Sequence, residues 1–284
     1  MYDRLLIPVD GSTGAARAVE YGLSVARATD AAVDLLYVVD TSIDRLIDPE
    51  EGRTLLDRSE KAGRRVTADI QKRETDLDID REIRHGKPYE EILAHADDRD
   101  IDLCVLGTRG AGDRRLGSTA ERVVTLADVP VVSVPDVEDL RLSLPEPLAD
   151  IVVATDGSDA AERAADHALA IGERFGATLH AVYVIDSTVY DLEDAPRSIV
   201  GLLREGGETV IEEITSSAQE VNVPATGQVL RGAPASELCE YADGVDAGLI
   251  AVGTRGREGV PDRLLGSTTR RIIRDAERPV LSLR

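Results

Sequence analysis

The sequence predicts an α/β fold formed twice, as two tandem Rossmann-like domains that each contain a doubly wound, five-stranded parallel sheet. Apolar runs of strand length alternate with segments of helical periodicity, a pattern typical of parallel strands covered by helices. The chain has 284 residues, which suits about two domains at roughly 150 residues each. The second half also repeats the first, so both halves are expected to fold alike.

The internal repeat is clearest at turn residues. Asp10 aligns with Asp156 and Gly107 with Gly253, both at an offset of 146 residues. The offset becomes 149 near the end of each copy, so one loop of the first copy is three residues shorter. A period of this length indicates duplication of a whole domain rather than a solenoid.

The elements of the first copy follow from their residue patterns. The apolar run Leu5–Val9 predicts a buried strand, and small residues at helical spacing after it predict a helix lying close to a sheet. The other expected elements are a strand over 33–39, a helix over 49–73, a strand over 77–83, a helix over 89–96, a strand over 101–106, a helix from 118 and a strand over 129–134.

The second copy repeats these elements up to a last strand over 279–283. Pro145 and Pro147 interrupt the segment between the copies, which predicts a linker. We therefore expect one domain over residues 1–136, a linker over 137–147 and a second domain over 148–284.

The charge balance excludes several classes of partner. The formal net charge is −21, and only three of the 33 basic residues are lysine. A surface this acidic repels nucleic acid phosphates and anionic membranes. We therefore expect neither as a partner. An acidic, lysine-poor composition is typical of halophilic proteins, because a salt-rich cytoplasm screens the self-repulsion.

The chain is expected in the cytoplasm. Asp3 and a short apolar run argue against a signal peptide, and no apolar stretch reaches the ~20 residues of a membrane span. Cys104 and Cys239 occupy unequal positions in the two copies and lack metal-ligand spacing. Both are expected to be buried small residues in a reducing compartment.

A glycine motif recurs late in each copy. Gly253-Thr-Arg-Gly256 leads after nine residues to the helix start Gly266-Ser267-Thr268, and Gly107-Thr-Arg-Gly110 leads after six to Gly117-Ser118-Thr119. Glycine permits positive φ and close approach of the backbone to a ligand. A helix start with free N–H groups and a hydroxyl favours a phosphate. The alternative is a loop with ordinary turn glycines.

An aspartate follows the first strand of each copy. Open α/β sheets bind ligands beyond the carboxyl ends of their strands, where strand order reverses. If the first and fourth strands are neighbours, Asp10 and Gly107 face one crevice, and Asp156 and Gly253 face another. The carboxylate could then hold a ribose or a Mg²⁺ ion beside bound phosphates. Alternatively, it only caps a turn or a helix.

Other phosphate-binding and catalytic motifs do not fit. A P-loop needs Gly-Lys-Ser/Thr, and no lysine precedes Ser118 or Ser267. The stretch Gly110-Ala-Gly112 begins like a dinucleotide fingerprint, but Arg115 stands where the third glycine belongs. The stretch also follows the fourth strand rather than the first. The four histidines are scattered, and no nucleophile–base or carboxylate pair is evident. No catalytic residue is assigned.

Both halves resemble the universal stress protein family, whose signature is Gly, two residues, Gly, nine residues, then Gly and Ser or Thr. The resemblance covers the chain outside the linker and implies strand order 3-2-1-4-5. Because one branch of the family binds ATP, the resemblance implies ATP as the ligand, with AMP or ADP as alternatives. Asp156 and Asp10 would lie near the ribose or the phosphates. The backbone of Val184 and of Val38 would pair with adenine. The implied contacts are Asp156, Val184, Gly253, Arg255, Gly256, Gly266, Ser267 and Thr268 in the second half, and Asp10, Val38, Gly107, Arg109, Gly110, Gly117, Ser118 and Thr119 in the first.

The resemblance also implies pairing through the last strand of each domain, so the two domains are expected to form a pseudo-dimer that hides two sheet edges. Whole chains could pair again as a homodimer. The shortened loop of the first half predicts weaker binding there, which makes the C-terminal domain the better site.

The leading function is a cytosolic stress-response protein that binds ATP as a regulatory ligand and changes its contacts with a protein partner. One alternative is a slow, Mg-dependent ATPase. The other is an interaction scaffold without a nucleotide, as in the family branch that lacks the glycine signature.

Overall fold

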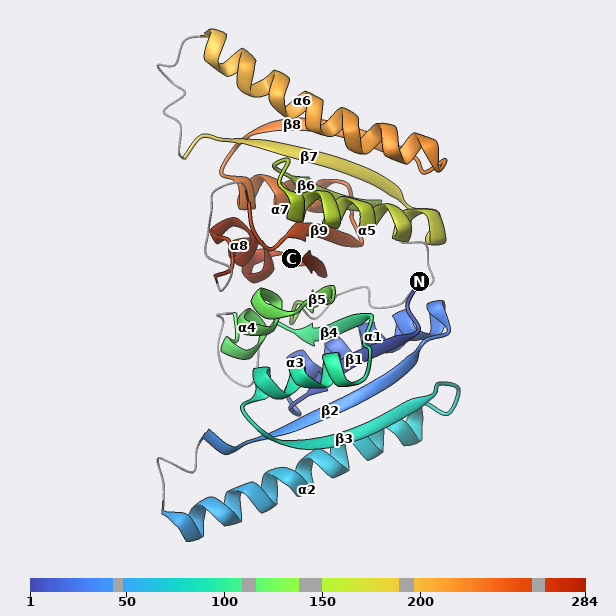
Figure 1. Ribbon diagram of the computed structural model, residues 1–284, viewed down its shortest axis with the longest axis vertical. Helices are drawn as coiled ribbons and strands as arrows, with labels where there is room; N and C mark the ends of the chain where they lie inside the picture. The colour runs from blue at the N-terminus through green and yellow to red at the C-terminus, as the bar shows by residue number, and fades with distance from the viewer. Residues whose placement is uncertain (43–47, 109–115, 138–149, 189–196, 257–263) are drawn as a thin grey trace. The chain divides into compact units, whose positions relative to one another are not determined.

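A computed structural model defines residues 1–42, 48–108, 116–137, 150–188, 197–256 and 264–284. The chain divides into two compact units (Figure 1). Unit 1 runs from Met1 through the last strand of the first copy, and unit 2 ends at Arg284. The predicted domain boundaries, linker and pseudo-dimer stay predictions.

Unit 1 is a parallel sheet covered by helices. Its elements are β1 (Arg4–Val9), α1 (Thr13–Thr29), β2 (Ala32–Asp40), α2 (Pro49–Arg73), β3 (Ile79–Gly86), α3 (Pro88–Asp98), β4 (Leu103–Gly107), α4 (Ser118–Leu126) and β5 (Val131–Val134). The strands pair in the order β3-β2-β1-β4-β5, and all four pairings are parallel.

Unit 2 repeats this arrangement. Its elements are β6 (Asp150–Thr155), α5 (Asp159–Phe175), β7 (Thr178–Asp186), α6 (Arg197–Glu220), β8 (Ala225–Gly232), α7 (Pro234–Gly244), β9 (Leu249–Gly253), α8 (Ser267–Asp275) and β10 (Val280–Leu283). The parallel order is β8-β7-β6-β9-β10. The predicted α/β class is confirmed, and both units have the strand order that the family resemblance implied.

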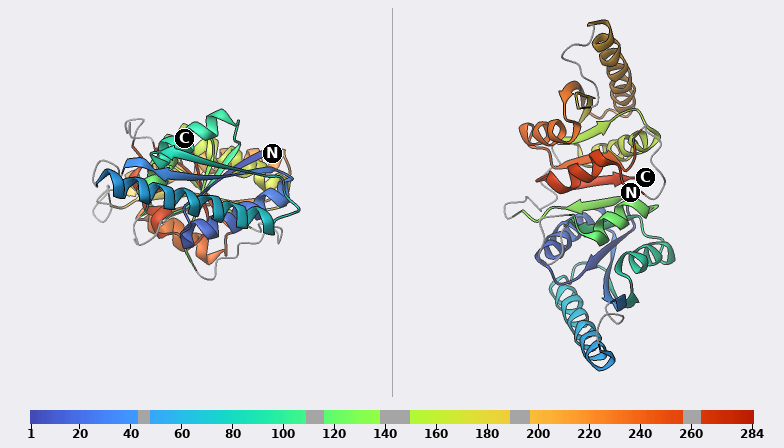
Figure 2. Two further views of the ribbon diagram at one scale, coloured as in Figure 1. Left: turned by 90° about the horizontal axis from the view of Figure 1, so that it is seen from below. Right: turned by 90° about the vertical axis from the view of Figure 1, so that its left-hand side faces the viewer.

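Helices pack on both faces of each sheet (Figure 2). In unit 1, Ile7 contacts α1 at Gly22 and Tyr37 contacts α2 at Gly63, at positions where a Cβ atom would collide with these side chains. Neighbouring strand residues point to the opposite face, where Leu36 is fully buried on the side of α3. Burial on both faces explains why the strands are continuous apolar runs.

Side-chain caps fix two of the helix starts. Ser12 Oγ accepts a hydrogen bond from the Ala15 N–H at 3.2 Å, so α1 begins at Thr13. Asp48 accepts from the Glu50 N–H at 2.9 Å, and Pro49 occupies the first helical position of α2. The long helix therefore covers the predicted residues 49–73. Within the described part of the chain, no helix is both long and apolar enough to cross a membrane.

Two local expectations are corrected. Gly253 and Gly256 do not use the positive φ that glycine permits. Positive φ occurs instead at Gly11 and Gly157, in the turns after β1 and β6. Cys104 is fully buried, as expected, but the second cysteine, Cys239, is only partly buried.

Candidate functional site

A cavity of about 260 Å³ opens in unit 1 at the carboxyl ends of β1 and β4. These two strands are neighbours, and β2 lies on the other side of β1. The cavity is therefore at the topological switch point of the sheet, where α/β folds bind ligands. Its lining includes all six described residues that were predicted as first-half contacts: Asp10, Val38, Gly107, Gly117, Ser118 and Thr119. The other two, Arg109 and Gly110, lie outside the described residues.

The turn after β1 carries Asp10 and Ser12 to the cavity. Asp10 Oδ1 accepts from the Ser12 N–H at 2.9 Å, and Gly11 has the positive φ of +81° that this turn requires. Asp10 therefore has the turn role that was considered as its alternative. Its side chain is nevertheless exposed and lines the cavity, so the structural role and contact with a ligand are compatible.

Helix α4 begins at the cavity without a side-chain cap. Its N-cap is Gly117, which makes no side-chain cap hydrogen bond. The first N–H groups of a helix lack intrahelical partners and carry partial positive charge, so they favour an anion. The hydroxyl-bearing residues Ser118 and Thr119 line the same end of the cavity. This end suits a phosphate.

Another part of the cavity lining, from β2 and α3, is apolar. Leu36 from β2, and Pro88 and Ile92 from α3, form much of this wall. A flat aromatic group fits such a wall better than a charged one. The sequence did not predict these residues as site residues. Their helical and strand spacing marks them as buried but does not say that they surround a cavity.

Gly107 and Gly253 also have a packing role. A Cβ atom on Gly107 would lie 2.6 Å from the carbonyl oxygen of Gly14, in the first turn of α1. A Cβ atom on Gly253 would lie 2.8 Å from the backbone nitrogen of Ala161 in α5. Glycine is therefore required at the ends of β4 and β9 for helix packing, whether or not a ligand approaches.

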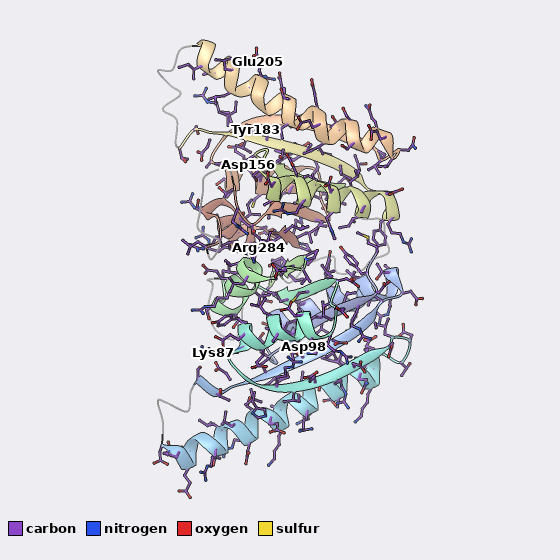
Figure 3. The ribbon with its side chains drawn as sticks, viewed as in Figure 1. Lys87, Asp98, Asp156, Tyr183, Glu205 and Arg284 are labelled. Atoms are coloured by element: carbon purple, nitrogen blue, oxygen red, sulfur yellow. The ribbon has the colours of Figure 1, made fainter. Side chains whose placement is uncertain are left out.

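Unit 2 has the same turn after β6. Asp156 Oδ1 accepts from the Ser158 N–H at 3.0 Å, and Ser158 Oγ donates to the carbonyl of Arg255 at 3.2 Å. Asp156, labelled in Figure 3, also lies against the backbone of Gly256. The glycine motif of unit 2 thus packs on the turn that holds the aspartate. Val184 is half-buried on β7, at the position that matches Val38.

Helix α8 also begins without a side-chain cap among the described residues, with Gly266 as its N-cap before Ser267 and Thr268. Thr269 Oγ1 donates to the carbonyl of Gly253 at 2.7 Å, which ties the helix to the end of β9. The first turn of α8 has no acidic residue, whereas that of α4 contains Glu121. The helix start of unit 2 is therefore the more favourable one for an anion.

The described residues include no group of three or more His, Cys, Asp or Glu side chains placed to hold a metal ion. Asp10 and Asp156 would each offer a single carboxylate to a cation. That donor set suits a Mg²⁺ ion that arrives with phosphates better than a site built by the protein alone.

The chain is similar to known proteins over its whole length. The profile of the universal stress protein family matches residues 1–135 and again 148–284. A universal stress protein of Methanocaldococcus jannaschii is 38% identical over 134 residues, which are 46% of this chain and 79% of the relative. One of Mycolicibacterium smegmatis is 28% identical over 300 residues, covering 99% of this chain and 96% of the relative.

Solved structures give the same result for the fold. The crystal structure of a universal stress protein from Archaeoglobus fulgidus superposes with a TM-score of 0.74 at 22% identity, covering 99% of this chain and 96% of that one. The two family matches account for nearly all of the residues in both units. This chain is a tandem, two-domain member of the universal stress protein family.

Proposed function

We propose that this protein binds an adenine nucleotide, with ATP as the main ligand, and that the nucleotide regulates its contacts with a protein partner in a cytoplasmic stress response. The observation that supports this most is the gathering of six predicted contact residues around one cavity of unit 1. These residues come from four separate segments of the chain, and the cavity lining combines apolar side chains with a helix start that favours an anion.

The proposed pose follows this polarity. The adenine lies against Leu36 and Ile92 and pairs with the backbone of Val38, while the ribose lies at Asp10. The phosphates lie at the start of α4. Pockets for drug-sized ligands have volumes of roughly 300 Å³ or more, so a cavity of about 260 Å³ suits the nucleoside, with the phosphates extending towards the glycine loop.

We further propose that unit 2 holds the nucleotide more tightly. Its motif has the full nine residues between Gly256 and Gly266, and its helix α8 has no acid in the first turn. The corresponding contacts are Asp156, Val184, Gly253, Arg255, Gly256, Gly266, Ser267 and Thr268.

A regulatory role is favoured over efficient hydrolysis. The described cavity contains one carboxylate, that of Asp10, and no histidine or cysteine. A lone carboxylate could position a Mg²⁺ ion, but the described lining offers no second group that could act as a general base towards an attacking water.

The test is to purify the full-length protein in high salt without added nucleotide, denature it, and identify released small molecules by chromatography and mass spectrometry. We expect ATP at close to one molecule per chain, from unit 2. The sample should then be loaded with ATP and Mg²⁺ and followed for phosphate release, which we expect to be slow relative to dissociation.

The alternatives give different results. Release of ADP or AMP, with Mg-dependent phosphate production, would indicate a slow ATPase. If no nucleotide is released and none binds on addition of ATP with Mg²⁺, the proposal is wrong and the interaction scaffold is the remaining function.

A further inference from the structure

His95 of α3 and Asp34 of β2 form a buried pair next to the cavity. His95 Nε2 lies 2.8 Å from Asp34 Oδ2, and the two side chains are 1% and 2% exposed. His95 Nδ1 lies 3.4 Å from Glu82 Oε2 of β3, an ion-pair distance outside hydrogen-bond geometry. Both nitrogens of a buried imidazole therefore face carboxylates.

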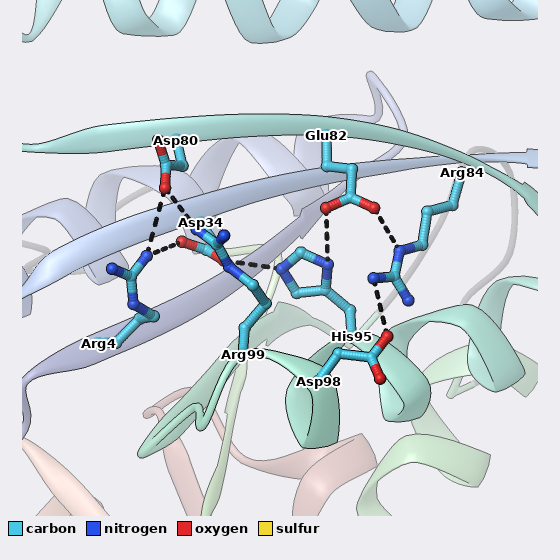
Figure 4. Close-up of polar contacts among 8 residues, drawn as sticks. All are labelled: Arg4, Asp34, Asp80, Glu82, Arg84, His95, Asp98 and Arg99. Atoms are coloured by element: carbon cyan, nitrogen blue, oxygen red, sulfur yellow. Dashed lines mark hydrogen bonds and ion pairs between the residues drawn. The ribbon is translucent and has the colours of Figure 1, made fainter.

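The pair belongs to a larger polar network that ties α3 to three strands (Figure 4). Asp34 Oδ1 accepts from Arg4 of β1 at 2.6 Å, and Asp34 Oδ2 accepts from Arg99, just after α3, at 3.1 Å. The other members, connected through these arginines or through Glu82, are Asp80, Arg84 and Asp98.

The charges of this network balance only when His95 is protonated on both nitrogens. Its three arginines carry three positive charges and its four carboxylates carry four negative charges. An imidazolium supplies the fourth positive charge. A neutral ring leaves one negative charge in excess and turns a lone pair towards a carboxylate, because only one ring nitrogen then carries a proton.

The polar layer lies directly beside the nucleotide cavity. Asp34 and Leu36 are two residues apart on β2 and therefore point to the same face of the sheet. His95 and Ile92 are three residues apart on α3 and share its buried face. Asp34 and His95 thus form one layer between β2 and α3, and Leu36 and Ile92 form the next layer, which lines the cavity.

Unit 2 has a different layer at the same place. His180 occupies the position that matches Asp34, and Tyr241 the position that matches His95. His180 Nε2 lies 2.7 Å from Asp150 Oδ1, and His180 Nδ1 lies 3.0 Å from the Tyr241 hydroxyl. This imidazole therefore has a carboxylate at one nitrogen only, because its Nδ1 lies against the hydroxyls of Tyr241 and, at 3.3 Å, Thr226.

We propose that His95 is a positioning residue whose proton holds α3 against the sheet and thereby sets the cavity wall and the nucleotide affinity of unit 1. Loss of that proton loosens the contact between α3 and β2, so the affinity of unit 1 falls as pH rises. Unit 2 lacks this dependence. The inference rests on the proposed nucleotide function.

Of the elements packed against α3, strands β2 and β3 contribute the groups that face His95. Strand β2 contributes Asp34 and β3 contributes Glu82. Helix α4 contributes Arg122, which lies over the ring of Tyr89 at the other end of α3, 4.5 Å from its centroid. The charged groups one contact further away are Arg4, Arg84 and Arg99, and Asp80 and Asp98 pair with these arginines in turn.

The experiment is an NMR titration of the full-length protein with ¹⁵N-labelled histidine rings and ¹³C-labelled isoleucine and leucine methyl groups. The ring nitrogens report the protonation of His95, and the Ile92 δ1 methyl reports the cavity wall. Without nucleotide, we expect the Ile92 signal to move with the same midpoint as His95, while Leu238, its counterpart in unit 2, does not. Titration with ATP and Mg²⁺ on either side of that midpoint should give unit 1 an affinity at least roughly fivefold weaker at the higher pH, the low end of ordinary coupling between sites.

A matched pair of variants sharpens the test. His95→Gln retains a donor for Asp34 but has no titrating proton, so it should remove the pH dependence of unit 1. His180→Gln changes the equivalent layer of unit 2 and should leave Ile92 and the ATP affinity of unit 1 unchanged. If His95→Gln does not fold, the titration of the natural protein still tests whether Ile92 and the ATP affinity of unit 1 follow the protonation of His95.

The possible failures are distinct. An Ile92 methyl that stays fixed while His95 titrates would overturn the inference, and so would an ATP affinity of unit 1 that is equal on both sides of the midpoint. If Ile92 follows His95 but ATP never shifts the signals of unit 1, the positioning role is supported and the proposal that unit 1 binds a nucleotide is wrong.

Discussion

The carboxylate of Asp156 lies directly against the backbone of Gly256, since a Cβ atom built on this glycine would be 2.6 Å from Asp156 Oδ2. The second glycine of the motif therefore contacts the aspartate that follows the first strand of the same unit. Ser158 Oγ also donates a hydrogen bond to the carbonyl of Arg255. The glycine motif and the turn after β6 are therefore held together by two contacts.

Gly256→Ala should weaken ATP binding at unit 2. The added methyl group displaces either the carboxylate of Asp156 or the loop, and we expect a loss of roughly tenfold in affinity, about 1.4 kcal/mol. Stability should change little, because Gly256 is exposed. Isothermal titration calorimetry with ATP and Mg²⁺ measures the effect, with any binding at unit 1 as the internal control. An unchanged affinity would remove this contact from the binding site.

Asp10→Ala should reduce ATP binding at unit 1, and Asp40→Ala provides a matched control. Both aspartates lie at the carboxyl end of a parallel strand and accept from the N–H two residues later at 2.9 Å, but only Asp10 lines the cavity. Each variant loses one turn hydrogen bond, worth about 1 kcal/mol, so similar losses of stability are expected by urea denaturation. Only Asp10→Ala should lower the affinity. Equal ATP binding by the two variants would limit Asp10 to its turn role.

Two adjacent glycines of α6 should respond in opposite directions to alanine. A Cβ atom on Gly206 meets nothing within 4 Å, whereas one on Gly207 would lie 2.6 Å from the ring of Tyr183. Gly206→Ala should stabilise the protein by about 0.5–1 kcal/mol, because alanine is the better helix former. Gly207→Ala should destabilise it by about 1–3 kcal/mol through overpacking. Thermal unfolding of both variants tests this packing, and a stabilising Gly207→Ala would contradict it.

The ionised form of Asp34 should stabilise unit 1. Burial alone would raise the pKa of Asp34, but hydrogen bonds from His95, Arg99 and Arg4 outweigh it and lower the pKa from 3.8 to about 2. A lowered carboxyl pKa contributes stability that is present above the unfolded value and lost as pH falls through the folded value. The free energy of unfolding should therefore decline by about 2 kcal/mol from this group between about pH 4 and pH 2.

Asp34→Asn tests this pH dependence. The variant should be less stable than the natural protein at neutral pH, because it leaves Arg4, Arg99 and the buried His95 without the carboxylate that they share. The difference should shrink as pH falls from about 4 to about 2. Urea unfolding of both proteins across this range measures it, and a difference that does not change with pH would show that the charge of Asp34 has no such role.

The two cysteines should differ in reactivity towards thiol reagents. Burial raises the pKa of the Cys104 thiol to about 12. Burial, with Asp243 and Asp275 nearby, raises the pKa of the partly buried Cys239 to about 11. Both should react slowly at neutral pH, because the thiolate is the reactive form, with Cys239 the faster. Mass spectrometry of the alkylated native protein distinguishes the two sites, and faster labelling of Cys104 would contradict its burial.

Much of the fold was predictable because it depends on local chemistry. The helix over 49–73 begins as predicted, since Pro49 follows the capping residue Asp48. The small-residue stripe around Gly22 marked a helix that packs closely on a sheet. The site residues at the ends of β1 and β4 were also recognisable, since strand ends and glycine turns can be read from short segments.

The sequence by itself determined the α/β class, the duplication, the element order and the residues at the strand ends, because these follow from periodicity, turn chemistry and repeated spacing. Only the tertiary structure decided that Pro88 and Ile92 complete the cavity and that His95 meets Asp34 across 61 residues of sequence. In the sequence His95 is one of four scattered histidines, and Asp34 interrupts an apolar strand. The crossover that lays α3 on β2 brings them together, and no local pattern encodes a contact that depends on the packing of two distant elements.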